Sequence, residues 1–178
     1  MNKPASDTSA AKIWTAISGT WRTAPDAVER DVRTAVADIL AAGGGIVSGG
    51  ALGVDYIATD EALKRDPAAQ SIRIILPTSL SDYANHYFKK AAEGVITPKQ
   101  AQDLIGQLTA VQGANPAALH ELPHTVCTPE TYYARNTAIL DAADNLAAFQ
   151  VNGSAGTQDT IDKALARGMA VAHKKYSL

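Results

Sequence analysis

Three short segments of the chain combine glycine with hydroxyl-bearing residues, a composition typical of loops that bind phosphate. They are Ser18-Gly19-Thr20, Ser48-Gly49-Gly50 and Gly153-Ser154-Ala155-Gly156-Thr157. Glycine allows backbone N–H groups to approach a phosphate closely, and a helix that begins after such a loop adds unpaired N–H donors and a positive dipole end. Any one segment could simply form a tight turn, but three together favour a ligand site. The expected ligand-binding residues of these loops are Ser18, Gly19, Ser48, Gly49, Gly50, Gly153, Ser154, Gly156 and Thr157.

The segment Ser48-Gly49-Gly50-Ala51-Leu52-Gly53 is similar to the G-x-G-x-x-G pattern of dinucleotide-binding loops. The first glycine of that pattern is missing. The acidic residue that would hold a ribose should end the next strand, and Ile72-Arg73-Ile74-Ile75-Leu76-Pro77 contains none. We therefore do not expect ordinary NAD binding.

His120-Glu121-Leu122-Pro123-His124 matches the H-E-x-x-H pattern of zinc proteases in its letters. That chemistry needs both histidines on one face of a continuous helix, whereas Pro123 lacks an amide donor and clashes with the preceding turn. We expect these histidines to lie in a solvated loop, and we predict no metal site.

Strand and helix signals alternate along the chain and would place the glycine loops at strand ends. Short β-compatible runs predict strands, and apolar residues at helical spacing predict helices between them. The predicted strands are 13–17, 46–47, 72–76, 125–127, 145–151 and 169–172. The predicted helices are 25–42, 54–64, 82–111 with a break near Gly94, 129–143, and a last one from the turn at 152–156 to Gly168.

This alternation is typical of an α/β protein with a three-layer Rossmann-like fold, in which a mostly parallel sheet has helices on both faces. Ligands of such folds bind beyond the carboxyl ends of the strands, so Gly49 and Gly156 should lie at that edge, on neighbouring strands. We expect a flexible tail over 1–11 and a single Rossmann-like domain over 12–178, with a helical insertion near 80–120.

The second half of the long helical segment carries its own start signal. Thr97-Pro98-Lys99-Gln100 matches a capping box with proline at the first helical position. The apolar stripe that follows consists of Leu104, Ile105, Leu108 and Val111. Such a stripe usually packs in the core, although here it could also form a lid or a dimer surface.

Composition limits the classes of partner. The chain has 178 residues, 46% of them hydrophobic, which is enough for one substantial core. Its 16 basic and 18 acidic residues nearly cancel, so any anion site must be local and DNA binding is not favoured. The single cysteine, Cys127, excludes an intramolecular disulfide. With no signal-like start and no run of roughly 20 apolar residues, we expect a cytoplasmic protein outside the membrane.

Two stretches resemble a known superfamily. Val47-Ser48-Gly49-Gly50-Ala51-Leu52-Gly53-Val54-Asp55 is similar to the S-G-x-A-x-G-I-D signature of the DNA-processing (DprA/Smf) proteins. Arg135-Asn136, Gly156-Thr157 and Arg167-Gly168-Met169-Ala170-Val171 resemble the second half of the wider SLOG superfamily, which joins those proteins to the Lonely Guy phosphoribohydrolases. The resemblance implies a Rossmann-like fold that binds nucleotides or their derivatives, often as a homodimer.

The resemblance also implies roles for particular residues. Ser48, Gly49 and Gly50 would line the phosphate pocket, while Gly156 and Thr157 would supply amides and a hydroxyl. Arg135, followed by Asn136, matches the arginine that contacts the substrate near its reactive sugar in the phosphoribohydrolases, and is the one candidate catalytic residue. Outside that family, an arginine on such a helix more often forms a surface ion pair.

One departure from the phosphoribohydrolase pattern leaves enzymatic activity open. The glutamate of P-G-G-x-G-T-x-x-E is replaced here by Thr160, and the adjacent Asp159 points in another direction on a helix. Cleavage of an N-glycosidic bond usually needs a carboxylate. The leading expectation is therefore binding of a nucleotide or nucleotide-derived phosphate ligand, and the sequence identifies no further cofactor. The alternatives are a nucleoside-monophosphate phosphoribohydrolase and a single-stranded DNA-binding protein of the DNA-processing type.

Overall fold

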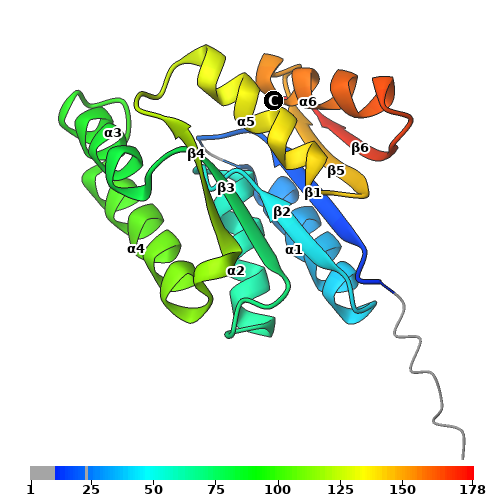
Figure 1. The fold of residues 1–178 in the computed structure, drawn as a ribbon. Coiled ribbons are helices and arrows are strands. Elements are labelled where there is room, and N and C mark those ends of the chain that lie inside the picture. Colours follow the sequence, from blue (N-terminus) through cyan, green and yellow to red (C-terminus); the bar gives the residue numbers. More distant parts are fainter. Residues whose placement is uncertain (1–10, 23) are drawn as a thin grey trace, which may run out of the picture.

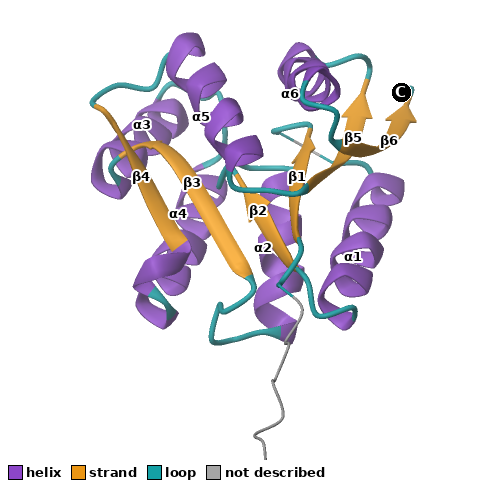
Figure 2. Cartoon of the chain, turned by 45° about the vertical axis from the view of Figure 1, so that its right-hand side comes forward, coloured by secondary structure: helices purple, strands orange, loops and turns teal. Residues whose placement is uncertain are grey.

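The computed structural model describes residues 11–22 and 24–178, and the expected tail over 1–11 lies outside this range except for Ala11. Six strands form one sheet in which every pairing is parallel (Figures 1 and 2). The strands are β1 (Trp14–Gly19), β2 (Gly45–Ser48), β3 (Ile72–Thr78), β4 (Leu119–His124), β5 (Asn145–Val151) and β6 (Ala170–Tyr176). Their order across the sheet is β4-β3-β2-β1-β5-β6.

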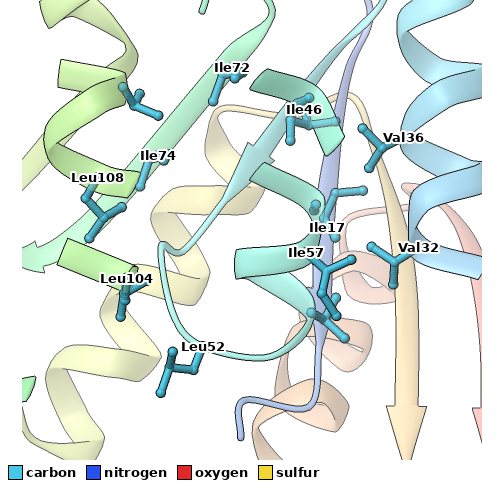
Figure 3. Packing of buried hydrophobic residues seen from close by; sticks show 14 of the residues in the cluster. Ile17, Val32, Val36, Ile46, Leu52, Ile57, Ile72, Ile74, Leu104 and Leu108 are labelled. Carbon is cyan, nitrogen blue, oxygen red and sulfur yellow. The ribbon is translucent and has the colours of Figure 1, made fainter. Parts of the chain in front are cut away.

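Helices cover both faces of this sheet, as the sequence predicts. They are α1 (Asp26–Ala41), α2 (Val54–Arg65), α3 (Leu80–Ala92), α4 (Pro98–Ala114), α5 (Pro129–Asp141) and α6 (Ala155–Ala166), with a short 3₁₀ turn at Pro116–Ala118 before β4. One apolar cluster joins the sheet to α1, α2, α3 and α4 (Figure 3), and a second joins the opposite face to α5 and α6. Neighbouring residues alternate between them: Ile17 packs in the first and Ala16 in the second. The three-layer Rossmann-like fold is confirmed.

Local signals explain where several helices begin. The Thr97 hydroxyl accepts the N–H of Gln100, and the Gln100 side chain accepts the N–H of Thr97, which completes the predicted capping box. Thr128 caps α5 in the same way, with Pro129 at the first helical position. The apolar stripe of α4 packs on the body of the protein, because Leu104, Leu108 and Val111 are fully buried.

The region before α5 differs from the prediction. Residues 125–127 form no strand, and the fourth strand is instead β4, which contains the H-E-x-x-H letters. His120 and His124 therefore lie in an edge strand rather than in a solvated loop. Pro123 is tolerated there because an edge strand has a free side that needs no N–H donor. Only Leu119 of the six β4 residues is buried, and apolar and polar residues do not alternate along the strand, so periodicity gave no strand signal.

The order of the strands creates a switch point at β1. The chain leaves β1 toward β2, β3 and β4, and then crosses back to place β5 and β6 on the other side of β1. The loops after β1 and β5 consequently diverge at the carboxyl edge, which is where open α/β sheets bind their ligands. The loops of Gly49 and Gly156 do share this edge. Their strands β2 and β5 are not neighbours, however, because β1 lies between them.

Among the residues that the structure describes, no helix is both long enough and apolar enough to cross a bilayer.

Candidate functional site

A cavity of about 270 Å³ opens at the switch point, between the loops that follow β1 and β5. Residues of α2, α3 and α5 and the N-terminus of α6 complete its lining. Many of the expected ligand-binding residues line it, namely Ser18, Gly19, Arg135, Asn136, Ser154, Gly156 and Thr157. Ser48, Gly49, Gly50 and Gly153 are not part of the lining. The fold thus brings the glycine turn at Gly156, the end of β1 at Ser18 and Gly19, and Arg135 to the same cavity.

The start of α6 presents backbone donors to this cavity. Asn152 and Gly153 adopt positive φ values of 48° and 65°, which turn the chain sharply from β5 into the helix. Ser154 is the N-cap residue, but its hydroxyl donates to Thr157 Oγ1 at 2.7 Å and no side-chain cap bond reaches the backbone. A Cβ on Gly156 would meet no atom within 4 Å. First-turn N–H groups that lack caps favour an anion.

Arg135 of α5 lies at the floor of the cavity and is only 9% exposed. Its Nη1 donates to the carbonyl oxygen of Gly49 at 2.6 Å and lies 3.8 Å from Asp55 Oδ2. Its Nε is buried and has no hydrogen-bond partner within the described part of the chain. A buried donor without a partner is costly, so Nε is an unusual feature of this site.

Asp55, in the first turn of α2, occupies the backbone amides that the sequence analysis assigned to a phosphate. Its Oδ2 accepts the N–H of Gly49 at 3.1 Å and that of Ala51 at 3.3 Å. The N–H of Gly50 donates to the Ser48 hydroxyl at 3.3 Å. The protein's own acceptors therefore satisfy the N–H groups of Gly49 and Gly50, and the Ser48-Gly49-Gly50 turn lies outside the lining of the cavity.

Burial raises the pKa of the Asp55 carboxyl, while Arg135 and the N–H groups of Ala51 and Gly49 act in the opposite direction. Asp55 is 8% exposed and lines the same cavity as Arg135. The two side chains form an acid–base pair that has very little contact with water.

Aromatic and cationic side chains that the sequence analysis did not single out surround the cavity. Trp21, 38% exposed, has the Arg22 guanidinium 4.8 Å and the Lys90 ammonium 5.6 Å from its ring centre. Tyr133, also exposed, has Lys163 at 5.4 Å. We call these five residues the aromatic–cationic rim. Trp21 follows Ser18-Gly19-Thr20 directly and was detectable, whereas Lys90 reaches the rim only through the packing of α3.

Within the cavity lining, the ring of Tyr132 packs near Arg135. The guanidinium lies 5.3 Å from the ring centre of Tyr132, whose hydroxyl is 3.3 Å from His86 Nε2. Burial raises the pKa of Tyr132, so the ring faces the arginine in its neutral form. Tyr83 donates to Tyr87 at 3.3 Å, and Tyr87 lines the cavity.

Few acidic groups reach the cavity. Thr160, which stands where the phosphoribohydrolases have glutamate, lines it, and its hydroxyl donates to the Gly156 carbonyl at 3.1 Å. Asp159 is outside the lining and accepts bonds from Asn136 at 3.3 Å and Lys163 at 2.8 Å. Asp55 is the one carboxylate among the lining residues. Within the described ranges, no three His, Cys, Asp or Glu residues gather as a metal site.

The family model described as DNA recombination-mediator protein A matches residues 7–176. Among solved structures, DNA processing protein A from Helicobacter pylori, which binds single-stranded DNA, has a TM-score of 0.64 and 23% identity, over 89% of this chain and 63% of that chain. The protein TM1055 and DNA processing protein A from Streptococcus pneumoniae each have a TM-score of 0.47 and 16% identity, over 90% of this chain and 72% and 58% of theirs. No curated protein matches the chain significantly.

Proposed function

The chain belongs to the DNA recombination-mediator protein A family, and from this premise we propose that its cavity binds a nucleotide-type ligand through a phosphate group. The observation that carries the proposal is the pairing of unused donors around one space. The first turn of α6 has no side-chain cap, and the buried Nε of Arg135 has no partner in the described structure. A phosphate oxygen would satisfy both.

The aromatic–cationic rim supports a nucleobase as the other half of the ligand. Trp21 and Tyr133 are exposed beside the cavity, and both have a cation within 6 Å of the ring centre. Bases stack on such rings without regard to sequence, with a contribution of about 1 to 3 kcal/mol per base. A base on the rim and a phosphate at α6 would together fill a site of this size.

Single-stranded DNA is the second candidate, because family membership and the rim both favour it. The solved H. pylori relative binds single-stranded DNA, and this chain spans 63% of that relative's length. In this case the nucleotide in the cavity would be one unit of a strand, and neighbouring phosphates would contact Arg22 and Lys90.

Phosphoribohydrolase activity has less support. Thr160 cannot replace the missing carboxylate, and Asp55 is already engaged by two amides and Arg135. Release of free base from nucleoside monophosphates would nevertheless be a direct assay for it.

Tryptophan fluorescence tests the proposal, because the chain has only two tryptophans. Trp14→Phe leaves Trp21 as the reporter at the cavity, and Trp21→Phe leaves Trp14, which packs against Arg73 away from it. We expect thymidine 5′-monophosphate or an oligothymidylate to quench the first variant and not the second. Saturation by the mononucleotide supports a small ligand, and response to the strand alone supports DNA. No response to either would contradict the proposal.

We also propose that the protein is cytoplasmic and forms a homodimer, the state that the resemblance implies. Light scattering of the purified full chain would test the dimer.

A further inference from the structure

We infer that Asp55 is a specificity-determining residue of the cavity, which makes it prefer singly charged phosphodiesters to doubly charged phosphomonoesters. The inference rests on the proposed function, since it concerns which phosphates enter the same site. It starts from a feature with no obvious use in anion binding, namely a buried carboxylate in the wall of an anion site.

The charge of the cavity follows from its lining. Arg135 and Lys90 are the cationic residues of the lining, and Asp55 is its one carboxylate. Their formal charges sum to about +1 when all three are ionised. The uncapped start of α6 adds roughly half a positive charge. A phosphodiester, with one negative charge, therefore leaves about half a positive charge in the site, whereas a monoester dianion leaves about half a negative charge.

A second ligand charge is costly in this site because attraction and desolvation scale differently. Attraction to the fixed charges rises in proportion to the ligand charge, while the cost of removing an ion from water rises with its square. The second charge of a monoester thus gains at most as much attraction as the first and costs about three times as much extra desolvation by this scaling.

Asp55 cannot turn away to relieve its repulsion of this second charge. Its Oδ2 is held by the N–H groups of Gly49 and Ala51 and lies 3.8 Å from Arg135. These contacts come from the β2–α2 loop and from α5, so two separate elements hold the carboxylate at the cavity wall. Asp55 also weakens the attraction between Arg135 and a bound phosphate, because the carboxylate already compensates part of the guanidinium charge.

The first test uses the unmodified full chain and two ligands that differ by a methyl group. We expect the methyl ester of thymidine 5′-phosphate to bind at least about fivefold more tightly than thymidine 5′-monophosphate at about pH 8, where the monoester is a dianion. The ratio should approach one at about pH 5, because the second phosphate pKa is near 6. The third ligand is an oligothymidylate without terminal phosphates. If it binds more tightly than the methyl ester, the preferred diester is that of a DNA strand. If the two bind with equal affinity, the preferred diester is that of a small molecule.

Protein groups that titrate in this range also change the ratio, because a change in protein charge acts more strongly on a dianion than on a monoanion. The decisive comparison is therefore the one at about pH 8, where the monoester is a dianion. The groups that face Asp55 and Arg135 are Tyr87 and Tyr132, whose pKa values are raised by burial, and His86, whose pKa is lowered by burial and which contacts Tyr132. Cys127 also faces Arg135, and burial raises the pKa of its thiol.

The second test removes the charge and keeps the shape. Asp55→Asn should lower the ratio of diester to monoester affinity at about pH 8 by at least about threefold, mainly by strengthening monoester binding. Asp162→Asn, on the exposed side of α6, makes the same change in net charge and should leave the ratio unaltered. A thermal melt identifies a variant that fails to fold. In that case, the affinities of the two thymidine ligands for the parent protein still test the preference for the diester.

The outcomes separate this inference from the proposed function. If both thymidine ligands bind with equal affinity at every pH, or the monoester binds more tightly at about pH 8, the site binds nucleotides and the inference is overturned. If the parent protein binds none of the three ligands, the proposed function itself fails, and this inference fails with it.

Discussion

Arg135 and Gly49 occupy adjoining space, so the missing side chain of the glycine decides where the arginine lies. A Cβ at Gly49 would overlap the guanidinium of Arg135, which bonds the Gly49 carbonyl. The glycine therefore acts by making room for a cation rather than by offering its N–H to a phosphate. Gly156 differs, because it faces open space in the cavity wall.

We expect Gly49→Ala to lower the free energy of unfolding by about 1 to 3 kcal/mol, since the added methyl group forces the guanidinium out of a packed position. Ligand binding should weaken as well. Chemical denaturation and calorimetric titration would measure the two effects. Parent-like stability together with parent-like affinity would mean that Arg135 has another position available.

Gly156→Val should abolish ligand binding and leave the fold intact. A β-branched side chain at this position would enter the cavity and crowd a phosphate at the α6 N-terminus, and no protein atom lies within 4 Å of the new Cβ. Gly106→Val, at an equally open position in α4 outside the cavity, is the matched control and should bind normally. Calorimetric titration and a thermal melt of both variants decide the matter. A folded Gly156→Val protein with parent affinity would show that this turn is structural.

Arg135→Ala should weaken binding by about 1 to 3 kcal/mol, the range for one charged hydrogen bond to phosphate. Titration beside Arg135→Lys distinguishes charge from geometry, because lysine keeps the charge and loses the planar donor set. Equal affinity of the alanine variant and the parent would exclude a contact between Arg135 and the ligand.

At the scale of elements, an ion-pair network joins α1 to α2, the helix that carries Asp55. Arg33 of α1 lies 2.6 Å from Asp60 and 3.3 Å from Glu61 of α2, and 2.8 Å from Glu29 of its own helix. Burial opposes ionisation of Asp60 and Glu61, but hydrogen bonds from Arg33, Lys64 and Arg65 outweigh it and lower both pKa values. The network thus stabilises the packing of α2 against α1.

This network makes stability depend on pH in the acid range. A carboxyl whose pKa is lower in the folded than in the unfolded state stabilises the protein above the unfolded pKa, near 4, and this stability is lost as pH falls through the folded pKa. Arg33→Met should cost about 1 to 2 kcal/mol at neutral pH, between the values for exposed and buried pairs. Thermal melts from about pH 6 to pH 3 should converge for variant and parent. A constant difference in melting temperature would contradict this account.

At the scale of the whole molecule, charge is local. The net charge is −2, so the protein as a whole does not attract a polyanion, and strand binding depends on the few cations around the cavity. If Arg135, Lys90 and Arg22 each contact a phosphate, binding releases roughly three counterions from the strand. The affinity then decreases as the salt concentration rises.

The affinity for an oligothymidylate should therefore fall with salt with a logarithmic slope of about −2, from about −0.7 per neutralised phosphate. Lys90→Met should reduce the magnitude of the slope by about 0.7. Lys175→Met, on exposed β6 away from the cavity, is the control and should not change it. Fluorescence titrations at several salt concentrations give the slopes, and a Lys90→Met slope equal to that of the parent would remove Lys90 from the interface.

The sequence by itself determined the features that depend on near neighbours in the chain. Apolar periodicity and turn residues located β5, α4 and α6 closely, and the capping box at Thr97 was correct in every contact. The alternation of these elements was sufficient to predict the fold class, and the structure has a cavity at the carboxyl edge where such folds bind ligands. Glycine-rich turns were correctly identified as turns of this edge, because their backbone geometry is a local property.

Only the tertiary structure decided which of these turns a ligand can use. The amides of Gly49 and Ala51 are occupied by Asp55, and Arg135 reaches Gly49 from a helix 86 residues further along the chain. The rim depends on Lys90 meeting Trp21 across two elements. Such contacts follow from strand order, crossover direction and helix packing, which bring distant residues together without leaving a periodic signal in the sequence. The composition of a loop therefore predicts its backbone, while the neighbours that the fold supplies decide whether its donors remain free.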